Sequence, residues 1–431
     1  MIPISRSGVC KAIGAFLIFA ISGWAWAEQP TPEPVRKGTS NIFGNNNEDE
    51  PDQNQEQAGD FPDFLRPGVR LTYFEGSSVV QGVNSQVVPD DKGNLVDPQT
   101  GKHYRQDDMK NSGGVGYAQI NVVTVDPELV AADARSFQII DLNNNTCSAT
   151  SVAALTGNAD QLGMYWINPA RLANMEPHAD RNERVNRIQY TLNDRNYDAI
   201  SMVSVSEAGY TSRIYDLKTG LLLSSSSSET GGNVNTLDKN NTITPGRGSS
   251  YISHSRFVSI RQVDIPWAQM RMPRWVSKVR QIDYQGGYTA ILQGGALPGY
   301  AMAVSFSIGQ VSHGCAQARM MTRSDIGNGL PPQESTVDRC FGSAMLAGLW
   351  VPPEALQQLN ENQLIDKDPI TRFRTTFTGI QGQSAIFVEQ GPSEITQTAY
   401  DVQSGVLQGI QTRRKTAAGE MQVQLQLAGQ Q

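Results

Sequence analysis

Three short sequence patterns occur twice along the chain, and this repetition constrains the fold more than any other feature. They return in the same order at offsets of 183, 184 and 185 residues: GYA at 116–118 and 299–301, YWINP at 165–169 with LWVPP at 349–353, and YDLKTGLL at 215–222 with YDVQSGVL at 400–407. Constant order and nearly constant spacing indicate a duplication, in which one structural unit is built twice. A fold for this chain must therefore divide into two related halves.

Short runs of alternating apolar and polar residues fill both halves. Runs such as RSFQIIDL, AISMVSV and YTSRIYDL are separated by Gly, Asn, Asp and Pro. This period of two is typical of antiparallel strands, and only residues 169–175 and 353–359 resemble short helices. We therefore predict a mainly β protein with two tandem diverged copies of an antiparallel curved-sheet domain, a half-barrel or a sandwich, each with one short helix.

The repeat offsets also place the domain boundaries. We assign residues 67–266 to the first β-rich repeat domain, 267–275 to a linker and 276–428 to the second repeat domain. The first copy is longer near 84–112, where a polar segment is predicted to form an inserted hairpin. Two domains agree with the chain length, because a single hydrophobic core seldom serves more than about 300 residues.

The N-terminus has the pattern of a secretory signal peptide over residues 1–27. Arg6 and Lys11 precede an apolar run at 12–21, and small residues end at Ala27, where we predict cleavage. The apolar run is shorter than the roughly 20 residues that span a membrane, and no later segment is long enough. Residues 28–60 have almost no apolar side chains to bury and are predicted to form a disordered arm. These features predict a periplasmic or secreted protein without a transmembrane segment.

The cysteines of the mature chain predict one disulfide. Cys315 and Cys340 lie in the same copy and close a moderate loop, so we expect them to pair in an oxidising compartment. Cys147 is left over, either as a buried thiol or as a member of an alternative pairing.

Composition and motifs argue against several functional classes. The net charge of −7 comes without a basic stripe, so a nucleic-acid partner is not expected. The sequence has neither a phosphate-binding loop nor a Gly-x-Ser-x-Gly elbow, and its four histidines lack paired spacing. We therefore predict no cofactor, no metal site and no catalytic residues.

Aromatic residues at equivalent places in the two copies are the candidate ligand-binding residues. Trp166 and Trp350 each precede a proline and a short helix, and Tyr117 and Tyr300 belong to the repeated GYA pattern. The favoured interpretation is that the tryptophans pack in the two cores. The alternative is that all four line an apolar ligand cleft between sheet and helix.

The linker is the candidate interface. Trp267, Arg271 and Trp275 are residue types that are enriched where proteins contact partners or membrane surfaces. A linker packed between the domains would explain the same composition, and both interpretations stay open.

These observations predict an exported, non-catalytic binding protein. It would act either as an envelope or extracellular component that binds a protein partner, or as a carrier of an apolar small molecule. One alternative is a carbohydrate-directed hydrolase with paired carboxylates, for which Asp366 and Asp368 are conceivable members. Another is a structural subunit that self-assembles through sheet edges.

Overall fold

The computed structural model describes residues 61–62, 64–81, 88–89, 95–96, 103–104, 114–142, 144–180, 182–206, 209–231, 236–237, 243–244, 249–292, 295–296, 299–325, 331–416 and 419–430. The predicted signal peptide (1–27) and the predicted arm (28–60) lie outside these residues, as does much of the predicted insertion near 84–112. The described part of that insertion holds β2 (Val88–Pro89), β3 (Leu95–Val96) and β4 (His103–Tyr104), which form a small antiparallel sheet.

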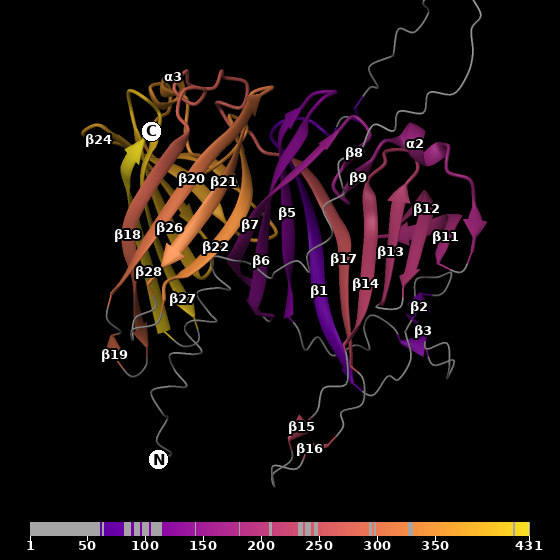
Figure 1. Cartoon of the computed structure of the whole chain (residues 1–431). Coiled ribbons are helices and arrows are strands. Elements are labelled where there is room, and N and C mark those ends of the chain that lie inside the picture. Colours follow the sequence, from indigo (N-terminus) through magenta and orange to yellow (C-terminus); the bar gives the residue numbers. More distant parts are fainter. Residues whose placement is uncertain are drawn as a thin grey trace, which may run out of the picture.

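Two large antiparallel sheets account for most of the described chain, which confirms the predicted fold class (Figure 1). The 12-stranded first sheet comprises β1 (Val69–Gln81), β5 (Gly114–Val125), β6 (Val130–Asp141), β7 (Thr146–Asn158), β8 (Gln161–Leu162), β9 (Trp166–Ile167), β10 (His178–Ala179), β11 (Glu183–Leu192), β12 (Arg195–Ser206), β13 (Gly209–Asp216), β14 (Leu222–Gly231) and β17 (Ser249–Gln262). The 11-stranded second sheet comprises β18 (Gln281–Leu292), β19 (Gly295–Ala296), β20 (Tyr300–Ser312), β21 (Cys315–Ser324), β22 (Gln333–Gly342), β23 (Gln363–Lys367), β24 (Arg374–Gln381), β25 (Ser384–Gln390), β26 (Glu394–Asp401), β27 (Leu407–Thr416) and β28 (Gly419–Gln430). A separate pair joins β15 (Thr236–Leu237) to β16 (Ile243–Thr244).

The same strand order recurs in both sheets. The first sheet runs β11-β12-β13-β14-β17-β1-β5-β6-β7, and the second runs β24-β25-β26-β27-β28-β18-β20-β21-β22. Helices α2 (Pro169–Ala173) and α3 (Pro353–Leu356) take corresponding places in the two chain segments. The repeated sequence patterns therefore fall at matching points of one topology, while the domain boundaries at 266 and 276 stay a prediction.

The repeated Tyr-Asp pattern forms the turn between β13 and β14 and the corresponding turn between β26 and β27. Asp216 accepts hydrogen bonds from the backbone of Lys218 (3.3 Å) and Thr219 (3.2 Å), and Gly220 has a φ of 75°. A Cβ at Gly220 would lie 1.8 Å from the carbonyl oxygen of Ile167, so the turn allows close approach of the strand that carries Trp166. The pattern is thus explained by local packing.

The hydrophobic core divides into two large clusters: one lies within the first sheet, and the other joins the second sheet to Val123 and Ala131 of the first. Trp166 lies in the cluster of the first sheet and Trp350 in the cluster of the second, which also contains the predicted disulfide between Cys315 and Cys340. The disulfide confirms the predicted pairing, and Cys147 is a buried free thiol. Among the described residues, no helix has the length and apolar character needed to cross a membrane.

Candidate functional site

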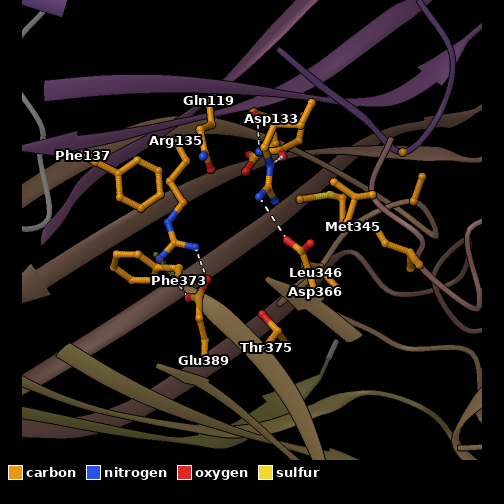
Figure 2. Close-up of a pocket in the computed structure, with 16 residues that line it drawn as sticks. Gln119, Asp133, Arg135, Phe137, Met345, Leu346, Asp366, Phe373, Thr375 and Glu389 are labelled. Atoms are coloured by element: carbon orange, nitrogen blue, oxygen red, sulfur yellow. Dashed lines mark hydrogen bonds and ion pairs between the residues drawn. The ribbon is translucent and has the colours of Figure 1, made fainter. Parts of the chain in front are cut away.

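The two sheets meet at a charged junction. Strand β22 of the second sheet lies against β5, β6 and β7 of the first (Figure 1). Beside this contact is a cavity of about 50 Å³ lined by both sheets, among others by Arg70 and Arg135 from the first and by Asp366 and Glu389 from the second (Figure 2). A cavity of this size has room for a few water molecules.

One group of ion pairs at the junction centres on two aspartates of the second sheet. Arg70 on β1 places Nη1 3.2 Å from Asp366 and 3.1 Å from Asp368. Arg261 on β17 binds the same two carboxylates, with Nη2 at 3.0 Å from Asp366 and 3.1 Å from Asp368. Both aspartates are buried, so the two arginines provide their charge compensation.

A second group of ion pairs centres on Arg135 of β6. Its Nη2 lies 2.9 Å from Oε2 of Glu389 and 3.8 Å from Glu394, and its guanidinium carbon is 4.9 Å and 5.1 Å from the rings of Phe137 and Phe373. Figure 2 shows the guanidinium between these two rings and directed at Glu389. The contacts join β6 of the first sheet to β25, β26 and the residue before β24 in the second.

A third contact joins β6 directly to β22. Arg339 donates from Nε and Nη2 to the two carboxylate oxygens of Asp133, at 2.9 and 3.2 Å. Burial is the largest influence on Asp133 and raises the pKa of its carboxyl, while Arg339 and Arg135 lower it in part. This two-point geometry is the strongest form of an ion pair between these side chains.

The charges of the ion-pair network at the junction balance. Five arginines face five carboxylates in this network: Arg70, Arg135, Arg261, Arg339 and Arg414 with Asp133, Asp366, Asp368, Glu389 and Glu394. A neutral, largely buried network holds two sheets in one relative orientation, because shifting either sheet would leave charges unpaired in a low-dielectric region.

The predicted carboxylate pair is part of this network. Burial would raise the pKa of Asp368, but the charge of Arg70 and hydrogen bonds from Thr371 outweigh it and hold the pKa below its ordinary value. A general acid in a glycosidase needs the opposite, a raised pKa and access to substrate. Asp366 and Asp368 are therefore arranged for pairing with arginine.

One polar group in the cavity lacks a partner. The side chain of Gln119 is 2% exposed and lines the cavity, and its Nε2 has no hydrogen-bond partner among the described residues. A buried amide donor of this kind is usually satisfied by ordered water.

The four aromatic candidates for ligand binding do not come together in one cleft. Trp166 is fully buried and donates from Nε1 to the carbonyl of Thr219 (3.0 Å), while Trp350 is 2% exposed in the other core. Tyr117 packs against Phe74, at 5.7 Å between ring centroids, and Tyr300 packs against Tyr288, at 5.2 Å. None of the four lines the junction cavity, and a ligand-binding role for them stays a prediction.

The linker tryptophans pack on the second sheet. Trp267 is buried with its ring 5.7 Å from that of Phe387, and Trp275 donates from Nε1 to the carbonyl of Ser404 (2.8 Å). Arg271 between them is exposed. The packing agrees with the packed-linker interpretation, and an interface role for these residues stays a prediction.

Two hairpin tips bring together side chains that could ligate a metal. Asp126, Glu128 and His313 have ligand atoms within 4.8 Å of one another, and Nδ1 of His313 lies 3.1 Å from Asp126. No sequence pattern indicates this group, because its members come from different sheets. Clusters of exposed acidic groups are common without an ion, so the cluster alone defines no metal site.

Comparisons with known proteins add little. No protein-family model matches the chain, and no curated protein matches it. A solved structure of MucB in complex with MucA(peri) aligns with 82% of this chain and 87% of that chain, at 10% sequence identity and a TM-score of 0.18. At that TM-score the likeness carries no conclusion about this chain.

Proposed function

We propose that the chain is an exported protein that binds another protein and performs no chemistry of its own. The observation that carries the proposal is the junction between the sheets. Its acidic and basic side chains pair with one another across the two sheets. This pairing fixes the position of one sheet relative to the other, and with it the outer surface of the molecule. It leaves none of these side chains as a general acid, a general base or a nucleophile. Preorganised surfaces of this kind reduce the ordering cost of binding a partner.

The disulfide supports export. Cys315 and Cys340 form a disulfide within the second sheet, and such bonds persist in the periplasm or outside the cell rather than in the cytosol. The predicted signal peptide gives the same localisation.

The geometry favours a protein partner over an apolar small molecule. The described cavity at the junction is small and rimmed by charged side chains, whereas small-molecule sites are concave and mostly apolar. Trp166 and Trp350, which would have lined an apolar cleft, are buried in separate cores. Exposed surfaces and sheet edges are therefore better suited to binding than the interior.

The experiment is affinity purification of the tagged mature chain from its own host after brief cross-linking. We expect one protein to be retained in constant proportion to the chain. Absence of a retained protein, or turnover of a glycan substrate by the pure chain, would contradict the proposal.

A further inference from the structure

The outer edge of β11 is open in the described structure. Its only outer neighbour, β10, has two residues and pairs with Arg184 and Val185. Among the residues that the structure describes, no strand pairs with the outer side of residues 186–192. The edge lies at the right of Figure 1, below α2.

The second sheet shows what occupies the corresponding place. There the chain leaves α3 and forms the five-residue β23, which pairs antiparallel along Arg374–Phe377 of β24. In the first sheet the chain leaves α2 and forms only β10 before β11 begins. The same topology is therefore completed by a longer edge strand in one sheet and left open in the other.

The hairpin between β11 and β12 determines which backbone groups face outward. Its two turn residues, Asn193 and Asp194, have φ values of 50° and 60°, and Leu192 pairs with Arg195. In a two-residue hairpin the closing pair exchanges hydrogen bonds, and bonded and non-bonded pairs then alternate along the strands. Arg187, Gln189 and Thr191 accordingly direct their N–H and C=O groups away from β12.

The side chains of β11 define the chemistry of an added strand. Ile188 and Tyr190 are partly buried against the cluster of Leu192, Ala199, Ile214 and Leu223. Arg187, Gln189 and Thr191 point to the opposite, exposed face, where Arg187 donates to the carbonyl of Ala173 (2.7 Å). An added strand would extend the apolar row with β-branched or aromatic residues and place polar residues beside the exposed row.

We propose that the outer edge of β11 from Arg187 to Thr191 binds an extended segment of a protein partner as an additional antiparallel strand. This inference rests on the proposed function and names its binding site. The segment supplies main-chain hydrogen bonds to three residues of β11 and has apolar side chains at alternate positions.

A second copy of this chain fits the edge less well. Antiparallel pairing of β11 with itself about Gln189 would bring the turn at Asn193 and Asp194 of the other copy beside Arg184 and Val185. That place is already taken by β10. A partner segment that ends before this point meets no such obstacle.

The test removes one outward N–H group without touching the ladder to β12. Gln189→Pro does this, because proline is tolerated on an edge strand when its missing N–H faces away from the sheet. Gln189→Ala is the matched control that changes only the side chain. A photo-cross-linking residue, p-benzoylphenylalanine, replaces Thr191 in the wild-type chain and in both variants. The three chains are irradiated in the host, and the cross-linked adducts are mapped by mass spectrometry.

We expect one adduct with a different polypeptide, mapped to an extended segment, whose yield falls about tenfold in Gln189→Pro and stays unchanged in Gln189→Ala. If Gln189→Pro does not fold, Thr191→Pro with the cross-linker at position 189 repeats the test. The inference is overturned by an adduct with a second copy of the chain, by an adduct insensitive to proline, or by no adduct. If affinity purification still retains a partner in these cases, the proposed function stands and only the edge assignment fails.

Discussion

Removing Arg339 should destabilise the protein strongly, because its partner would remain buried. Asp133 is 5% exposed and receives two hydrogen bonds from Arg339, at 2.9 and 3.2 Å. Arg339→Met keeps most of the apolar volume of the side chain and deletes the charge. Asp133 would then be a buried carboxylate that has lost its two-point partner.

Breaking a buried ion pair by removing one member costs about 3–5 kcal/mol. Arg135 also lowers the pKa of Asp133 and would compensate part of the charge, so the lower part of this range applies. The guanidinium of Arg339 lies 5.0 Å from the ring centroid of Phe341, and loss of this cation–π contact adds about 0.5–1 kcal/mol. We therefore expect the free energy of unfolding to fall by about 3.5–5 kcal/mol.

Urea unfolding followed by tryptophan fluorescence measures this change. Arg319→Met is the matched control: Arg319 pairs with Asp338 at 3.2 Å on the neighbouring strands, but both side chains are more than two-thirds exposed, at 68% and 69%. Its loss should cost under about 1 kcal/mol. The double variant Asp133→Asn/Arg339→Met should recover most of the lost stability. Equal, small losses for Arg339→Met and Arg319→Met would show that burial of Asp133 does not set the cost of removing its partner.

Three further predictions concern a carboxyl group, a thiol and the disulfide. Burial raises the pKa of Glu75 from 4.5 to about 7, so ionisation of this carboxyl opposes folding as the pH rises through this interval. In urea unfolding, Glu75→Gln should be more stable than wild type by up to about 3 kcal/mol at pH 8 and equally stable at pH 4. An equal effect at both pH values would contradict the raised pKa. Burial also raises the pKa of the Cys147 thiol to about 11. The chain lacking residues 1–27 should therefore react with a thiol reagent at pH 8 only after unfolding. Rapid reaction of the native chain would contradict the burial of Cys147. Replacing Cys315 and Cys340 by Ser opens a loop with a sequence separation of 25 and should lower thermal stability by an amount corresponding to about 3.5 kcal/mol, while an unchanged melting temperature would count against the disulfide.

Local patterns made much of the fold predictable. Alternation predicted strands, and the repeated patterns around Trp166 and Trp350 predicted two related sheets with short helices. These signals depend on neighbouring residues, because a strand's side-chain period and a turn's glycine are local properties. The disulfide was predictable for a similar reason: Cys315 and Cys340 are the only cysteines in the second half of the chain.

The junction could not be predicted in the same way. Arg70 and Asp366 are 296 residues apart in the sequence, and no local pattern states which charged residues of two separate sheets will meet. A partial signal was present in β6, where Asp133 and Arg135 interrupt the apolar first half of the strand. Charged residues at inward-facing positions of a strand usually have a partner from another element. Which residues are the partners of Asp133 and Arg135 follows only from the arrangement of the two sheets.

Native mass spectrometry of the mature chain, purified from its own host under conditions that keep non-covalent complexes intact, shows directly whether the chain binds a protein partner. We expect a species in which the chain carries a second, different polypeptide, and the loss of that polypeptide from Gln189→Pro but not from Gln189→Ala. A chain that carries one or two apolar small molecules, or a chain that is always bare, would contradict binding of a protein partner.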